Sequence, residues 1–343
     1  MLQQVKRAAL AASRLSGFDA LLARSRWRTG RFLILCYHGI SLEREHEWNP
    51  ELYMSPEAFG LRLGLLAKHR CTVLSLDDAL RRSEENDLPP RSVVITFDDG
   101  MFDFHHRAMP ILKQFGFPAT VYLTSFYAQF QHPVFYLACS YLLWKHRCTP
   151  EILAGIEDWL RRENPSAEKQ QSVFEELACQ RGEDAAEWGR KRILHLMTPE
   201  EVRDAARKGF RVQLHTHRHR TPVDAGLFTR EIKQNRDCIQ RWTGQDTPHF
   251  CYPNGIVHSE FLPWLQEAGV RSSVTCIPGL ARASDNRLLL PRLVDHSGLS
   301  ELEFESWLSG AGAILRSLRP QSDRSPLVPA ACHPAERGRH VPE

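Results

Sequence analysis

Short apolar runs alternate with longer amphipathic segments along most of the chain. Runs rich in β-branched and aromatic residues predict strands at residues 31–36, 72–74, 93–97, 119–123, 210–214, 249–252 and 271–276. Between them, capping residues predict helices: Ser55, Pro56 and Glu57 supply an N-cap, a proline at the first helical position and an acidic first turn. This alternation predicts an α/β fold with a largely parallel sheet. About seven strands suit either a barrel or a doubly wound sheet.

Three segments depart from this alternation. Residues 1–30 have apolar positions at helical spacing among basic residues, which predicts a basic amphipathic N-terminal helix. Residues 127–197, roughly, carry charged helical faces and little strand signal, so we expect a helical insertion within one domain that spans residues 31–318. Residues 319–343 contain five prolines and little periodicity, which predicts a disordered tail.

The overall charge argues against some partners. The chain has 343 residues and 44 lysines and arginines against 41 aspartates and glutamates, a net charge of only +3. No global basic field recruits nucleic acid, and we expect no such partner.

Cysteine usage and the N-terminus bear on the location of the protein. Nine cysteines are scattered without a C-x-x-C pair, which is typical of reduced, intracellular proteins. The N-terminus lacks the uninterrupted apolar stretch of a signal peptide, so we expect a cytoplasmic protein. The basic helix over residues 1–28 either packs on the domain or contacts an anionic membrane surface at the cytoplasmic face.

Two polar motifs follow predicted strands directly. Asp98 and Asp99 come after the strand at 93–97, where two adjacent carboxylates repel each other unless a cation lies between them. His215 and His219 follow the strand at 210–214 and lie on one face of a helical turn. Two imidazoles and one carboxylate form a typical zinc site with an open position, and a second carboxylate beside it is placed to act as a base.

Two further strand ends carry weaker signals. His38 follows the first strand within Cys-Tyr-His-Gly, and residues 250–255 read Phe-Cys-Tyr-Pro-Asn-Gly. Alone, the first is typical of a core histidine and the second of a plain turn. Because active sites of α/β folds lie at the carboxyl ends of parallel strands, we expect all four motifs to meet at one edge.

Together these motifs resemble the polysaccharide deacetylases, the carbohydrate esterase family 4 with the NodB homology domain. Thr-Phe-Asp-Asp-Gly at 96–100 and His-Thr-x-x-His at 215–219 match the first two family motifs, and residues 250–255 are similar to the third. Tyr-His-Gly-Ile at 37–40 resembles the start of exopolysaccharide-type members. The similarity runs from about 32 to 293 and implies a distorted (β/α) barrel of about seven parallel strands with a helical insertion.

The resemblance also implies a reaction and its residues. Asp99, His215 and His219 would hold a divalent metal, most often zinc, and Asp98 would be the general base that takes a proton from the metal-bound water. The backbone N–H of Tyr252 would stabilise the oxyanion. The implied activity is removal of the N-acetyl group of an amino sugar in a polysaccharide or glycan precursor, as in cell-surface or exopolysaccharide biosynthesis.

The sequence departs from the family pattern in two places. Cys251 stands where the family often has an arginine that holds the base; Arg292 is one candidate for the missing charge, and a surface position is the alternative for it. The late motif that supplies the general acid is absent except for His296. Members that begin with Tyr-His are thought to use that histidine, so we favour His38 as the acid over His296.

Three functions therefore remain open. The first is a deacetylase acting on an N-acetylated glycan or a lipid-linked sugar. The second is a hydrolase of the same mechanism acting on a non-sugar amide. The third is a non-catalytic carbohydrate-binding relative of the same fold, which the two departures allow.

Overall fold

The computed structural model describes residues 10–317 with the exception of 12, 14, 132 and 164. The predicted tail at 319–343 and residues 1–9 of the predicted N-terminal helix lie outside the described residues. The following account concerns the described part only.

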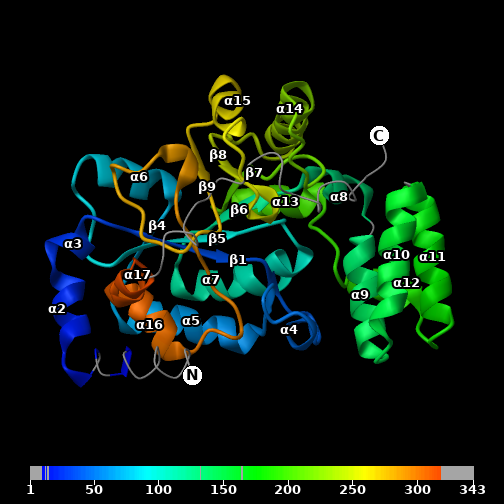
Figure 1. Cartoon of the computed structure of the whole chain (residues 1–343), viewed down its shortest axis with the longest axis horizontal. Coiled ribbons are helices and arrows are strands. Elements are labelled where there is room, and N and C mark those ends of the chain that lie inside the picture. Colours follow the sequence, from blue (N-terminus) through cyan, green and yellow to red (C-terminus); the bar gives the residue numbers. More distant parts are fainter. Residues whose placement is uncertain (1–9, 12, 14, 132, 164, 318–343) are drawn as a thin grey trace.

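The centre of the molecule is a curled parallel sheet (Figure 1). Its strand order is β10-β1-β5-β6-β7-β8-β9, with β4 paired to β5 as well, and every pairing is parallel. A bridge between Val274 and Leu290 brings the two ends of the sheet together. The strands are β1 (Leu33–Tyr37), β4 (Thr72–Leu74), β5 (Ser92–Phe97), β6 (Thr120–Leu123), β7 (Arg211–Leu214), β8 (His249–Cys251), β9 (Ser272–Val274) and β10 (Leu293–Val294). The predicted distorted (β/α) barrel is confirmed.

All seven strands predicted from the sequence are present, and three short ones were not predicted. β10 has only two residues, so it carries no periodic signal. β2 (Gly39–Ile40) and β3 (Tyr53–Met54) pair in parallel as a separate small sheet. Strands of two residues are too short for alternation of apolar and polar positions to identify them.

Helices surround the sheet and begin at the capping residues that the sequence contains. The Ser55 side chain accepts a hydrogen bond from Ala58 N, and Thr198 forms a capping box with Glu201. The last described helical segment breaks in two at Gly310, whose φ of 99° lies in the left-handed region. The helices are α2 (Phe18–Arg24), α3 (Arg26–Thr29), α4 (Glu45–Trp48), α5 (Pro56–Lys68), α6 (Leu76–Glu84), α7 (Met109–Phe115), α13 (Pro199–Arg207), α14 (Ala225–Thr243), α15 (Phe261–Glu267), α16 (Glu301–Ser309) and α17 (Ala311–Ser317), with a π-helical turn at Phe104–Ala108 and 3-10 turns at Pro253–Gly255 and Arg287–Leu289.

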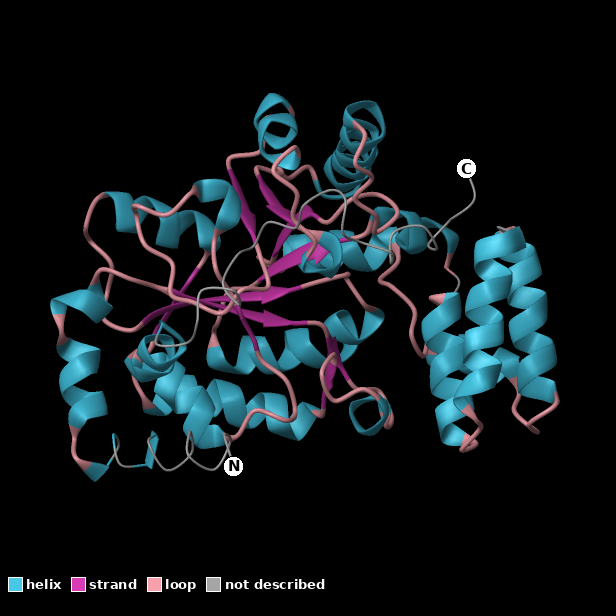
Figure 2. Cartoon of the chain, in the orientation of Figure 1, coloured by secondary structure: helices cyan, strands magenta, loops and turns pink. Residues whose placement is uncertain are grey.

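A separate group of helices lies beside the barrel (Figure 2). After α8 (Ser125–Phe130) come α9 (Phe135–Lys145), α10 (Pro150–Glu163), α11 (Ala167–Cys179) and α12 (Ala185–Lys191). We call α9–α12 the helical insertion. Its core includes Leu142, Phe174 and Trp188 and extends to Tyr53 and Met101 of the barrel. The barrel has its own larger core.

The two ends of the helical insertion lie side by side. Val134 N donates a hydrogen bond to Leu194 O at 3.0 Å. Leu196 forms an antiparallel bridge with Met101, and Met197 N donates to Gly100 O at 3.0 Å. The insertion therefore enters and leaves next to the loop that follows β5.

Part of the described N-terminal segment exposes apolar side chains. Leu15, Phe18 and Leu21 are exposed, whereas Leu22 and Ala23 of α2 are buried. Among the helices within the described residues, none is both long and apolar enough to cross a membrane.

Candidate active site

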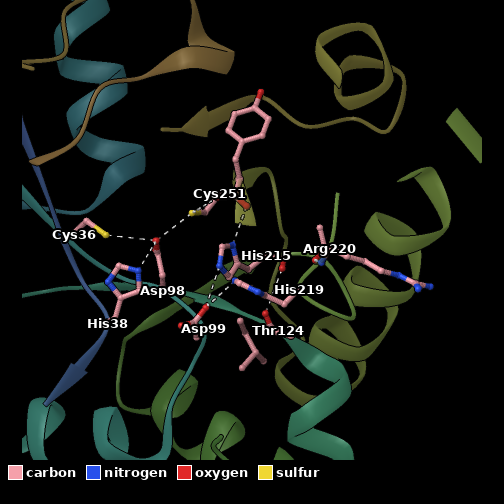
Figure 3. A network of polar contacts seen from close by, with 12 residues as sticks. Cys36, His38, Asp98, Asp99, Thr124, His215, His219, Arg220 and Cys251 are labelled. Carbon is pink, nitrogen blue, oxygen red and sulfur yellow. Dashed lines mark hydrogen bonds and ion pairs between the residues drawn. The ribbon is translucent and has the colours of Figure 1, made fainter. Parts of the chain in front are cut away.

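The strand order brings the four polar motifs to one edge of the sheet (Figure 3). β1 leads to His38, β5 to Asp98 and Asp99, β7 to His215, and β8 ends at Cys251. Because these strands are parallel, their carboxyl ends face the same way. This juxtaposition is the one that the sequence predicted.

Asp99, His215 and His219 form a compact group of possible metal ligands. Asp99 Oδ1 lies 3.3 Å from His215 Nε2 and 3.2 Å from His219 Nε2. The His215 side chain is buried at 2% exposure, but Asp99 and His219 are 26% and 23% exposed. Carboxylate oxygen and imidazole nitrogen are ligands of divalent cations including zinc, and the exposed side leaves an open position.

A hydrogen bond sets the tautomer of His215. His215 Nδ1 lies 2.9 Å from the carbonyl oxygen of Cys251, which can only accept, so the Nδ1 proton is donated there. The Nε2 lone pair is thereby directed towards Asp99 and His219, as it is in histidines that ligate metals. Burial alone would raise the pKa of Asp99, but His219 and His215 hold it well below its ordinary range.

Two other groups of potential ligands include Asp98 together with a cysteine. Both oxygens of Asp98 are already engaged by a guanidinium, whose positive charge disfavours a cation at the same carboxylate. Among the described residues, the group of Asp99, His215 and His219 therefore fits a metal best.

Asp98 is a buried carboxylate held by Arg292. Arg292 Nη1 donates to Oδ1 and Nη2 to Oδ2, both at 2.7 Å. The thiols of Cys36 and Cys251 also point at Oδ2, at 3.4 and 3.3 Å. Burial raises the pKa of Asp98, but Arg292 outweighs this effect, and the net pKa lies well below its ordinary value.

Arg292 supplies the charge that the third motif lacks. Its side chain is fully buried, and Nη2 also donates to Cys251 Sγ at 3.1 Å. Its Nε donates to Thr275 O at 3.0 Å. The alternative of a surface position is wrong: the residue just before β10 reaches the site from a strand beyond the third motif.

His38 faces the same carboxylate. Its Nε2 lies 3.9 Å from Asp98 Oδ2, and its side chain is 17% exposed. The backbone beside it is tightly confined: a Cβ at Gly39 would collide with the ring of Tyr53 and come within 3.0 Å of Asp103 Oδ2. This close approach fixes the loop that carries His38.

The other residues considered from the sequence lie as follows. His296 follows β10, and its Nδ1 accepts a hydrogen bond from Gly298 N at 3.2 Å. The phenol of Tyr252 is buried and donates to Leu288 O at 2.9 Å, so only the backbone of Tyr252 is available to the site.

Two polar residues of α14 hold the loop that carries the histidines, and the sequence analysis missed both. Asn235 Oδ1 accepts from His215 N at 2.9 Å. The buried Glu231 accepts from Arg218 N at 2.7 Å and from the Arg220 side chain at 2.9 Å. Their spacing of four residues among apolar helix positions was the available signal. The loop needs this support because Thr216 and His219 have left-handed φ angles of 61° and 55°.

The end of β6 braces the loop from the other side. Thr124 N donates to Asp99 O at 3.1 Å, and its hydroxyl donates to His215 O at 3.3 Å. At the start of α8, Ser125 Oγ contacts His217 Nδ1 at 2.8 Å and Phe126 N donates to His217 O at 2.8 Å. The possible ligands from β5 and β7 are thus held in one hydrogen-bonded unit.

A sequence profile of the polysaccharide deacetylases matches residues 85–273, more than half of the chain. The chain belongs to the polysaccharide deacetylase family. This confirms the resemblance drawn from its motifs. Over 106 residues it is also 30% identical to the poly-beta-1,6-N-acetyl-D-glucosamine N-deacetylase of Escherichia coli (strain K12). That match covers 29% of this chain and only 15% of the relative.

Solved structures of deacetylases share the fold of this family member. Streptococcus pyogenes deacetylase PplD, solved in complex with acetate, has a TM-score of 0.56 at 22% identity, over 84% of this chain and 99% of that one. IcaB from Ammonifex degensii has a TM-score of 0.56 at 16% identity, over 82% and 97% of the two chains. At these identities the likeness supports the fold.

Proposed function

We propose that this protein is a metal-dependent deacetylase that hydrolyses the N-acetyl group of an amino sugar within a glycan. The observation that carries the proposal is the pair of adjacent carboxylates with different partners. Asp99 meets two imidazoles, whereas Asp98 meets a guanidinium and lies beside His38. One carboxylate suits a cation and the other suits proton transfer, which amide hydrolysis by water requires.

Each residue has one role in this proposal. Asp99, His215 and His219 hold a divalent cation, for which we propose zinc; when bound, it supplies Lewis acidity to a water molecule and to the amide carbonyl. Asp98 accepts the proton of the attacking water, and Arg292 holds Asp98 in its ionised form. The N–H of Tyr252 donates to the developing oxyanion.

A general acid must protonate the departing sugar amine. We propose His38, because its Nε2 lies 3.9 Å from Asp98 and its side chain is partly exposed. His296 is the alternative. His38→Ala and His296→Ala should be compared side by side. The variant that no longer releases acetate identifies the general acid.

We propose a polymer of N-acetylglucosamine as the substrate class, with a role in exopolysaccharide biosynthesis. Support comes from the Escherichia coli relative, which is named for a poly-beta-1,6-N-acetyl-D-glucosamine substrate. A lipid-linked precursor of such a polymer is the alternative. Hydrolysis of a non-sugar amide is the other activity that the same site chemistry allows.

For location we propose the cytoplasm, with contact at the inner membrane surface. The eight described cysteines are free thiols, which fits a reducing compartment. Exposed Leu15, Phe18 and Leu21 beside the exposed Arg24 and Arg26 fit an anionic membrane surface. α2 and α3 precede β1, whereas His38 follows it, so such contact would turn the active site away from the membrane.

The experiment is acetate release from β-1,6-linked N-acetylglucosamine oligomers, measured together with metal content. We expect Asp98→Asn to keep the metal and to lose about 10²–10⁴-fold in rate, because the proton acceptor is gone. His215→Ala is the paired variant and should lose both metal and activity. Wild-type turnover in Asp98→Asn would contradict the assigned base. A metal-loaded wild type that releases no acetate from any N-acetylated sugar would contradict the activity.

A further inference from the structure

A cavity of about 540 Å³ lies where the helical insertion meets the end of α8. This volume falls within the range of about 300–1,000 Å³ that is typical of ligand sites. Phe174 and Trp188 are apolar parts of the lining, and the amides of Gln131 and Gln171 are polar parts. His195, which directly precedes the bridge to the barrel, also lines it.

The cavity is tied to the active site through two short connections. Its residue His195 accepts a hydrogen bond from Phe102 N at 2.8 Å, and Phe102 is three residues beyond Asp99. Three residues of extended chain span at most about 11 Å, which limits the distance from Asp99 to this wall. α8 makes the second connection: it begins at the hydrogen bond to His217 and ends next to Gln131, a helix length of about 9 Å.

An exposed aromatic surface lies along α8. Phe126 and Phe130 are one helical turn apart, and their ring centroids are 4.6 Å from each other. Phe130 is 52% exposed, although phenylalanine side chains of this size are usually buried. Exposed aromatic surface next to a catalytic site is typical of a binding groove.

The chemistry of the lining limits what the cavity can hold. Among the described residues that line it there is no lysine or arginine, whereas Glu175 and Asp184 contribute carboxylates. Phosphate and other anionic ligands are therefore disfavoured. Phe174 and Trp188 are almost fully buried, at 1% and 2% exposure, so amide and carboxylate groups beside smaller apolar side chains form the accessible wall. Such a wall suits a neutral molecule with many hydroxyl groups, such as a sugar unit.

We propose that this cavity binds a sugar unit of the same glycan chain, distant from the unit that is deacetylated. The inference rests on the proposed function. In this proposal the helical insertion has a role in substrate binding, because the bound glycan extends from the metal ligands along α8 into the cavity. Long glycans therefore bind more tightly than short ones. Asp98, Asp99 and the histidines act on any N-acetyl group, and the cavity adds affinity only for a polymer.

Two glycines of the insertion provide a matched pair of variants. A Cβ built at Gly189 in α12 or at Gly155 in α10 meets nothing within 4 Å, and both positions are helical. Only Gly189 lines the cavity. We therefore expect Gly189→Phe and Gly155→Phe to fold alike, while only the first blocks the cavity.

The measurement compares long and short substrates. With a β-1,6-linked N-acetylglucosamine pentamer, Gly189→Phe should raise KM about tenfold and leave kcat unchanged, because binding remote from the reacting bond is lost. With N-acetylglucosamine itself, wild type and both variants should have the same kcat/KM. Gly155→Phe should match wild type throughout. If Gly189→Phe does not fold, Ala186→Phe on the same wall replaces it.

The possible failures are distinguishable. Suppose that the enzyme releases acetate and that Gly189→Phe leaves the KM for the pentamer unchanged. This result overturns the proposal that the cavity binds a sugar unit, but it is compatible with the proposed function. If no protein releases acetate, the proposed function fails, and calorimetric titration with the pentamer decides about the cavity. If Gly189→Phe binds the pentamer more weakly than wild type and Gly155→Phe do, the proposed sugar site in the cavity is supported. If all three proteins bind it equally, or none binds it, the proposed site is overturned.

Discussion

In the barrel, charged groups pair in buried places, among them the active site, whereas the charged side chains of the helical insertion lie largely at its surface. Arg292 and Asp98 pair at full or nearly full burial, with two cysteine thiols against the same carboxylate. In the insertion, Arg190 pairs with Asp184 while both side chains are more than half exposed. A buried pair tolerates the loss of neither partner, but an exposed pair contributes little. The barrel thus concentrates its chemistry where substitution is most damaging, and the insertion can vary.

The largest contrast should appear when each pair loses its arginine. Arg292→Met leaves the buried Asp98 without its counter-charge and should destabilise the fold by about 3–5 kcal/mol. Arg190→Met should leave the unfolding midpoint where it is, because water already solvates Asp184. Urea unfolding of the two variants beside wild type measures both effects. Equal midpoints for the two variants would show that the buried pair has no special weight.

A smaller effect is expected from the support of the histidine loop. Glu231→Gln keeps the shape of the side chain but removes the charge that holds Arg218 and Arg220. We expect about 10–100-fold weaker zinc affinity, because the loop that carries His219 loses its anchor. Competition with a chelator measures this affinity. Glu176→Gln on the exposed face of the insertion is the control, and a matching loss there would contradict the specific role of Glu231.

The smallest expected effect is a loss of stability of the helical insertion at acidic pH. Burial tends to raise the pKa of Glu183, but hydrogen bonds from Lys145, Trp188 and His146 lower it from 4.5 to about 2. A carboxyl whose pKa is depressed on folding stabilises the fold above its ordinary pKa, and this contribution disappears as the pH falls from about 4.5 towards 2. The protection of amides in α9 and α12, measured against the intrinsic exchange rate at each pH, should therefore decrease over this range in wild type. Glu183→Gln should show less change, and an equal response in both proteins would exclude Glu183 as the cause.

Much of the barrel and its site could be predicted because the signals are local. An apolar run followed at once by Asp98 and Asp99, or by His215, shows both the strand and its end. Parallel pairing then requires these ends to share an edge, which is a rule of the fold rather than of any single residue.

The parts that could not be predicted depend on contacts distant in sequence. Arg292 reaches Asp98 across 194 positions, and nothing around it indicates whether its side chain points inwards. β10 has two residues, too few for any period. Glu231 is an ordinary helix residue until the loop that it holds is in place. The cavity is formed by α11, α12 and the segment that follows α8, and no one of these segments contains a signal for it.

The meeting of Val134 and Leu194 has a consequence for how this protein can change. β6 and β7 are paired residue by residue up to Leu123 and Leu214. The sheet therefore already holds together the two ends of the segment that contains the helical insertion. Doubling the length of such a segment adds only about 0.6 kcal/mol of closure entropy. Helices can therefore be gained, lost or exchanged between Val134 and Leu194 while β6 and β7 keep their register. If the insertion binds the polymer as proposed, substitutions there can alter which polymer is bound without changing Asp98, Asp99, His215 or His219.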